Sequence, residues 1–160
     1  MSEASHLDLD QALERAGIDL PRVMPPLGDY LYASEHAGIV FVSGQTPTVE
    51  GRPLLRGRLG QELTVEQGYD MARLTMLNVL AILRHHLGDL SRVDKILRIT
   101  GYIAAVPEFA EHPRVLDGAS HLMRQVWGAR GAHARLAVGV AGLPQQAPVE
   151  IEAIVALRDS

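Results

Sequence analysis

Two stretches decide the fold: Ala134-Arg-Leu-Ala-Val-Gly-Val-Ala141 and Val149-Glu-Ile-Glu-Ala-Ile-Val-Ala-Leu157. Both are rich in β-branched and small apolar residues, and the loop Gly142-Leu-Pro-Gln-Gln-Ala-Pro148 separates them. Apolar runs bounded by glycine and proline are typical of strands. The sequence therefore predicts a final pair of strands over 134–141 and 149–157.

Side-chain alternation along these strands predicts an unusual sheet face. In the second strand the odd-numbered positions are all apolar, so Glu150 and Glu152 share the opposite face. In the first strand we expect Leu136, Val138 and Val140 to face the helices. The opposite face then carries Arg135, Ala137, Gly139 and Ala141. Small residues beside an arginine and two carboxylates favour a subunit or ligand packing closely there over a plain solvated face.

Two amphipathic helices are predicted between the strands. The first begins at the capping box Thr64-Val-Glu-Gln67, repeats apolar residues at helical spacing and ends at Gly88. The second begins near Pro113 and ends at Gly128. Further strands are predicted over 39–43 and 96–103. This order predicts an α+β fold with a single sheet and two helices packed on one face.

The N-terminal part carries a smaller helix. We expect it over 6–16, ended by Gly17, and we expect an extended lead-in over 21–28, where three prolines exclude regular structure. No linker or repeat divides the chain. The prediction is one domain over 1–160, with 1–27 as an N-terminal extension.

Composition and net charge argue against several classes of function. The net charge of −4 and the pI of about 5.9 argue against nucleic acid as a partner, and Arg52, Arg56 and Arg58 are interpreted as a solvated loop. The chain has no cysteine, which excludes disulfides and thiolate chemistry. No apolar run approaches the about 18 residues of a membrane span, and no secretory signal is evident, so a cytoplasmic location is expected. The adjacent His85 and His86 point about 100° apart on a helix, so no metal site is predicted.

The sequence leaves two interpretations open for Arg135 and for Glu150, an ordinary surface position or a role in a functional site. Either side chain can be an ordinary polar residue on a half-exposed strand, with the arginine reaching toward water. Alternatively both serve a site. If the last two strands form a hairpin, the two side chains lie on the order of 13 Å apart along it. A site that uses both would then lie between chains.

The run His133-Ala-Arg-Leu-Ala-Val-Gly-Val-Ala-Gly-Leu-Pro144, followed by Pro148-Val-Glu-Ile-Glu-Ala-Ile154, resembles the signature of the YjgF/RidA family of reactive-intermediate (enamine/imine) deaminases. The resemblance extends to Gly28-Asp-Tyr30 and to Val42-Ser-Gly-Gln45, and so covers roughly residues 28–157. The N-terminal extension resembles a longer branch of that family. The resemblance implies a chorismate-mutase-like fold and a homotrimer with its sites between subunits.

The resemblance also implies residue roles. Arg135 would bind the substrate's carboxylate, and Glu150 would hold or activate water. The cleft and substrate contacts would come from Tyr30, Ser43, Gly44 and Ala137. Many members carry a cysteine where Ala137 stands, and a backbone carbonyl can make that contact instead. For an asparagine expected in the second helix, Asp117 and Ser120 are the candidates.

The implied reaction is hydrolysis of a 2-imino acid or its enamine, of the 2-aminoacrylate type, to a 2-keto acid and ammonia. A guanidinium suits a carboxylate because its parallel donors fix the carboxylate plane. No cofactor is needed. Two alternatives stay open: an endoribonuclease or translation inhibitor, a label also attached to this family, and a trimer that binds a small ligand without turnover.

Overall fold

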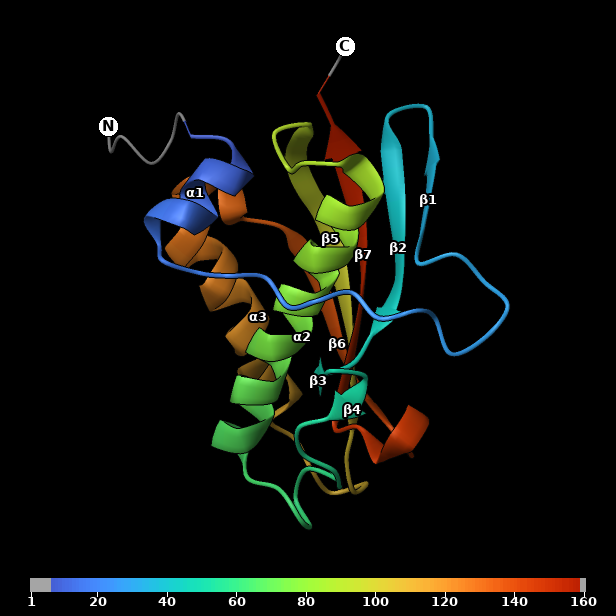
Figure 1. Cartoon of the computed structure of the whole chain (residues 1–160). Helices are drawn as coiled ribbons and strands as arrows, with labels where there is room; N and C mark the ends of the chain where they lie inside the picture. Colours follow the sequence, from blue (N-terminus) through green and yellow to red (C-terminus); the bar gives the residue numbers. More distant parts are fainter. Residues whose placement is uncertain (1–6, 159–160) are drawn as a thin grey trace.

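The computed structural model describes residues 7–158, and its centre is a five-stranded sheet in the order β1-β2-β7-β5-β6 (Figure 1). The strands are β1 (Ala33–His36), β2 (Ile39–Gln45), β5 (Val93–Ala104), β6 (Ala134–Val140) and β7 (Val149–Leu157). A separate two-stranded sheet joins β3 (Thr48–Val49) to β4 (Arg52–Pro53). The helices are α1 (Leu9–Arg15), α2 (Val65–Leu87) and α3 (His112–Trp127), with short 3-10 turns at Gly128–Gly131 and Pro144–Gln146.

The two long helices begin and end where local chemistry predicts. Thr64 Oγ1 accepts a hydrogen bond from the Gln67 backbone at 3.2 Å, and Gln67 Oε1 accepts from the Thr64 backbone at 2.9 Å, so the capping box is confirmed. Gly88 has a φ of 88°, a conformation that glycine adopts without steric cost, and it ends α2. The second predicted helix is likewise confirmed as α3, which ends before Gly128.

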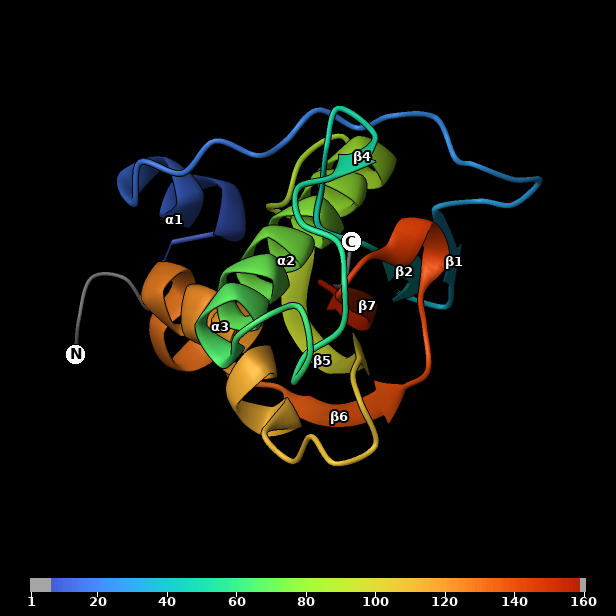
Figure 2. The same ribbon diagram turned by 90° about the horizontal axis from the view of Figure 1, so that it is seen from below.

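Both long helices pack on one face of the sheet, as Figure 2 shows along the strands. Buried apolar side chains of α2, α3, β5 and β7 form a single core cluster between the layers. The two helices approach closely at Gly118, where an added Cβ would lie 2.0 Å from the Tyr69 carbonyl oxygen. The predicted α+β architecture is therefore confirmed.

The predicted pairing of the last two strands is wrong. Strand β6 pairs with β5 in parallel, whereas β7 runs antiparallel between β5 and β2. Helix α3 connects β5 to β6, and a strand–helix–strand crossover places its two strands parallel. The loop over 142–148 then passes the end of β5, a span of about 9.6 Å for strands two positions apart.

The predicted facing of β6 is also wrong. Leu136 and Val138 are 46% and 36% exposed on the helix-free face, whereas Arg135 forms an ion pair with Asp117 of α3. Gly139 likewise lies against His112, at the start of α3. Strand β6 is an edge strand with one neighbour, so its inner face borders solvent and can carry an arginine. Hydrophobicity therefore does not mark the inner face of this strand.

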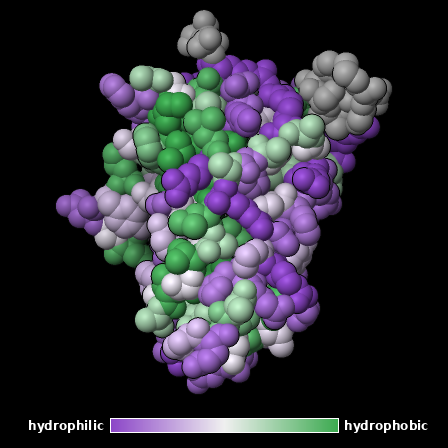
Figure 3. Space-filling view, turned by 180° about the vertical axis from the view of Figure 1, so that it is seen from behind, coloured by the Kyte–Doolittle hydropathy of each residue, from purple (hydrophilic) through white to green (hydrophobic). Residues whose placement is uncertain are grey.

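The helix-free face combines exposed apolar side chains with the two predicted carboxylates. Across the strands, Phe41 lies beside Ile154. Glu152 lies beside Thr100 and Glu150 beside Tyr102, whose hydroxyl donates to Glu152 at 3.1 Å. Seen from behind in Figure 3, hydrophobic surface runs down the side of β1 and β2, interrupted by hydrophilic side chains. Exposed apolar side chains and two carboxylates therefore share this face.

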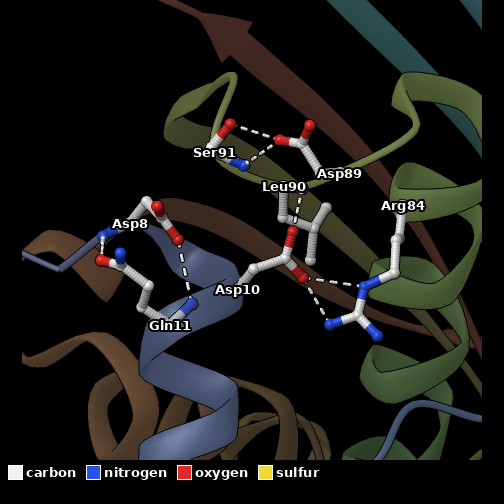
Figure 4. A network of polar contacts seen from close by, with 7 residues as sticks. All are labelled: Asp8, Asp10, Gln11, Arg84, Asp89, Leu90 and Ser91. Carbon is white, nitrogen blue, oxygen red and sulfur yellow. Dashed lines mark hydrogen bonds and ion pairs between the residues drawn. The ribbon is translucent and has the colours of Figure 1, made fainter.

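Helix α1 corresponds to the helix predicted over 6–16, although residues 1–6 lie outside the described part of the chain. Its Asp10 binds the Arg84 side chain and the Leu90 backbone N–H, which joins α1 to the end of α2 (Figure 4). Leu9 and Leu13 are fully buried in the shared core. The extension is thus packed on the domain through both polar and apolar contacts.

Within residues 7–158, no helix is both long and apolar enough to cross a membrane.

Candidate functional site

Three contacts with α3 hold the Arg135 guanidinium. Its Nη1 lies 2.8 Å from Asp117 Oδ1 and donates to Ser120 Oγ at 3.1 Å, and its Nη2 donates to the Pro113 carbonyl at 3.3 Å. A guanidinium has five N–H donors, so Nε and one Nη2 hydrogen have no acceptor among the described residues. The side chain is 27% exposed. Arg135 is therefore fixed in place and keeps donors for an anion.

Ser120 also contacts His133, two residues before Arg135. The Ser120 Oγ lies 3.0 Å from His133 Nε2, and His133 Nδ1 lies 2.8 Å from the Gly131 carbonyl oxygen. Burial lowers the pKa of His133, and the Arg135 guanidinium lowers it further, whereas the bond to Gly131 acts in the opposite direction. The lowered pKa therefore favours the neutral form of His133.

These side chains border a cavity at the edge of the sheet. Its volume is about 270 Å³, and Arg124 and His121 complete its polar lining beside Arg135, Ser120 and His133. A cavity with two arginines and one aspartate favours a small anion. Its position, between the start of β6 and the middle of α3, is set by the parallel crossover.

Glu150 lies on the other face of the sheet, against β2. An added Cβ on Gly44 would lie 2.0 Å from Glu150 Oε1, so glycine at this position makes room for the carboxylate. A break in the register between Val42 and Gln45 places this glycine there. Burial raises the pKa of Glu150, and the nearby Glu152 raises it further. Glu150 is thus closer to its protonated form at neutral pH than an exposed glutamate is.

Tyr30 and Ser43 lie near Gly44 but differ in their contacts. Tyr30 is 46% exposed and, with Gly44, lines a separate cavity of about 380 Å³ beneath the N-terminal lead-in. Its ring meets Tyr32 edge to face at 5.8 Å between centroids. The Ser43 hydroxyl donates to the Leu31 carbonyl at 2.7 Å, so it fixes the chain before β1.

Within one chain the predicted site residues form two groups. Gly44, Glu150 and Tyr30 gather at the end of β2, whereas Arg135 lies across the sheet on its helix side. Ala137 packs against the core and contributes no side chain to either cavity. Neither of the two cavities described above has both Arg135 and Glu150 in its lining.

Sequence reasoning named Asp117 and Ser120 as alternatives, and both in fact contact Arg135. It missed His133 as a functional residue. The signal was available, because alternation predicts the same direction for positions 133 and 135. The helical spacing of 117 and 120 also places their side chains on one face of α3.

The fold and site define a class: a chorismate-mutase-like α+β protein with an anchored arginine at an edge-strand cavity. Residues 10–151 match the family described as "YjgF/chorismate_mutase-like, putative endoribonuclease". The chain belongs to this family, YjgF/RidA.

Several known proteins are similar to this chain. Protein TCP17 of Trypanosoma cruzi is 38% identical over 148 residues, which cover 92% of each chain. The crystal structure of a "putative endoribonuclease" from Shewanella oneidensis is 34% identical in sequence and has a TM-score of 0.88. The match covers 94% of this chain and 100% of the Shewanella chain. Escherichia coli TdcF, solved with bound serine, is 27% identical with a TM-score of 0.59, over 88% of this chain and 94% of its own.

Proposed function

We propose that this protein hydrolyses 2-imino acids and their enamine tautomers, of the 2-aminoacrylate type, to 2-keto acids and ammonia. The observation that carries the proposal is the anchored guanidinium of Arg135, which keeps unpaired donors beside a small cavity. Family membership supports the same reaction class. Serine bound to TdcF, a protein of the same fold, agrees with a ligand of amino-acid size.

Arg135 would bind the substrate's carboxylate and so orient C2 for attack. Because three α3 contacts already hold the guanidinium, little side-chain entropy is lost when the substrate binds. Two donors that share one plane also fix the plane of the carboxylate. Holding a reactive carbon in one orientation toward water accelerates its hydrolysis without a cofactor.

Glu150 would exchange protons with the substrate or its water. Its raised pKa suits this role, since a general acid–base works best when its pKa lies near the working pH. An enamine must accept a proton at C3 to become the imine, and a carboxyl group with a raised pKa beside it is a better donor than an exposed glutamate.

Arg135 and Glu150 would meet only across subunits, in a homotrimer. They lie on opposite faces within one chain, and the helix-free face exposes Phe41 and Leu136 at 54% and 46%. Burying such apolar surface against other copies is favourable, by about 25 cal/mol per Å². The free edge of β6 would then border the neighbouring chain, with Arg135 beside it.

The test generates imines in situ with an amino-acid oxidase and traps the remainder with semicarbazide. We expect the wild type to remove the imine before trapping, and we expect Arg135→Ala to lower kcat/KM by about 100-fold or more, since a charged contact in the transition state is lost. Arg114→Ala is the matched control, because Arg114 lies on α3 but, among residues 7–158, pairs only with Glu111. Equal turnover by Arg135→Ala and the wild type would defeat the assignment.

Two alternatives predict different results. A ligand-binding trimer would bind 2-keto acids through Arg135 but would not accelerate imine loss. An endoribonuclease would cleave RNA, with salt-sensitive binding. The net charge of −4 favours the small-molecule reaction over RNA cleavage.

A further inference from the structure

Ser120, His133 and Arg135 form a chain of hydrogen bonds whose directions follow from the Gly131 carbonyl when the His133 ring is neutral. The Gly131 carbonyl can only accept, so His133 Nδ1 carries a hydrogen. In the neutral ring Nε2 is then the acceptor, and the Ser120 hydroxyl donates to it at 3.0 Å. Arg135 Nη1 donates to the same hydroxyl oxygen at 3.1 Å.

This arrangement leaves one position open on the Ser120 oxygen. A hydroxyl oxygen has two lone pairs, and Arg135 occupies one of them. The second can accept a hydrogen bond from a water molecule in the cavity, which both Ser120 and His133 line. A water bound there would lie beside the guanidinium that holds the substrate.

We infer that Ser120 and His133 form a proton relay that activates the hydrolytic water on the same chain as Arg135. The inference rests on the proposed function and adds an acid–base group that family resemblance does not assign to this chain. Ser120 is the residue that touches the water, and His133 acts through it.

The steps balance as follows. The water oxygen bonds to C2 of the iminium while its proton passes to Ser120 Oγ, and the Ser120 proton passes to His133 Nε2. The C=N π electrons move to nitrogen, which gives a neutral carbinolamine and a protonated His133. The relay then returns the proton to the amine, the C–N bond breaks, and the hydroxyl proton leaves with ammonia as ammonium. The products are the 2-keto acid and ammonium.

The charges around His133 favour the base form that this step needs. Arg135 and Arg124 border the same cavity, and the positive charge of Arg135 disfavours an imidazolium. Asp117 acts in the opposite direction, but it is paired with Arg135 at 2.8 Å. His121, the other titratable group in the lining, contacts the Tyr69 hydroxyl through Nδ1 at 3.1 Å.

The test compares His133→Gln with His86→Gln, a control histidine on α2 that lies 3.6 Å from Glu35 and outside this cavity. The glutamine amide at 133 can accept from Ser120 but cannot take up a proton. After subtraction of uncatalysed hydrolysis, we expect wild-type kcat/KM to fall as the pH drops below the ordinary histidine value of 6.5, because imidazolium cannot accept the water's proton. In His133→Gln we expect kcat/KM to be lower by about 100-fold and this acidic decline to be absent.

His86→Gln is expected to keep both the rate and the decline. Glu150→Gln is expected to keep the decline. If His133→Gln matches the wild type in rate and pH profile, the relay is overturned and the proposed function remains. If the wild type itself shows no turnover, both fail. Independently, ¹⁵N NMR of neutral His133 should show hydrogen on Nδ1; hydrogen on Nε2 would overturn the relay whatever the activity.

Discussion

At Arg135, one guanidinium would serve two carboxylates in the proposed complex: that of Asp117 and that of the substrate. Asp117 is 34% exposed and lies 2.8 Å from Nη1. Its negative charge holds the arginine but repels a second carboxylate bound to the remaining donors. Asp117 is therefore a positioning residue that limits affinity.

Asp117→Asn keeps an oxygen acceptor for Arg135 and removes the repulsive charge. We expect KM to fall about fivefold with kcat little changed, since one screened charge pair near a surface contributes about 1 kcal/mol. The dissociation constant of a 2-keto acid, measured by calorimetry, should fall in parallel. Weaker binding by Asp117→Asn would show that the charge of Asp117 is needed to hold the guanidinium.

At the scale of elements, the close contact between α2 and α3 places the site. Because an added Cβ on Gly118 would meet the Tyr69 carbonyl oxygen at 2.0 Å, Gly118→Ala must push the helices apart. We expect the free energy of unfolding to fall by about 2–3 kcal/mol in urea titrations, despite the better helix propensity of alanine. Gly142→Ala is the control, since nothing lies within 4 Å of its added Cβ and its φ is not positive. Equal stability of the two variants would contradict the tight packing.

The elements themselves were predictable where their signals are local. Capping boxes and terminal glycines act within one turn, so the limits of α2 could be read from a few residues. Strand pairing is not local. The seven residues of the loop over 142–148 are long enough either to join two neighbouring strands or to pass the end of a strand that lies between them. The turn at Ala37 and Gly38 could not be predicted from the sequence either. Both residues have a positive φ, 48° and 74°, but the chain lacks the Asn-Gly pair that usually marks such hairpin turns.

In the candidate site, too, local features could be predicted from the sequence and non-local contacts could not. Side-chain alternation drew attention to Arg135 and Glu150, and the resemblance to the YjgF/RidA family implied their roles and added Gly44. Their faces could not be read for β6, since an edge strand exposes both of its sides. The contacts of Ser120 with His133 depend on how α3 lies over β6, which is a property of the assembled layers.

At the scale of the whole molecule, the proposed active site is incomplete in a single chain, because Arg135 and Glu150 would come from different subunits. Phe41 is far from Arg135 in the sheet order, at the opposite side of β7 and β5, and it is 54% exposed on the helix-free face. A charge there would disfavour association of that face without touching either cavity. Phe41→Glu therefore separates the effect of assembly from the effect of site chemistry.

We expect light scattering to give a mass three times that of the 17.4 kDa chain for the wild type and a single-chain mass for Phe41→Glu. Circular dichroism should be unchanged, because the substituted side chain is exposed in the monomer. Imine turnover should fall by about 100-fold, since a monomer cannot bring Glu150 to Arg135. Leu54→Glu, at a position 57% exposed outside the five-stranded sheet, should leave mass and turnover unchanged. A monomeric Phe41→Glu variant with full turnover would place the whole reaction in one chain and leave Ser120 and His133 as its acid–base groups without Glu150.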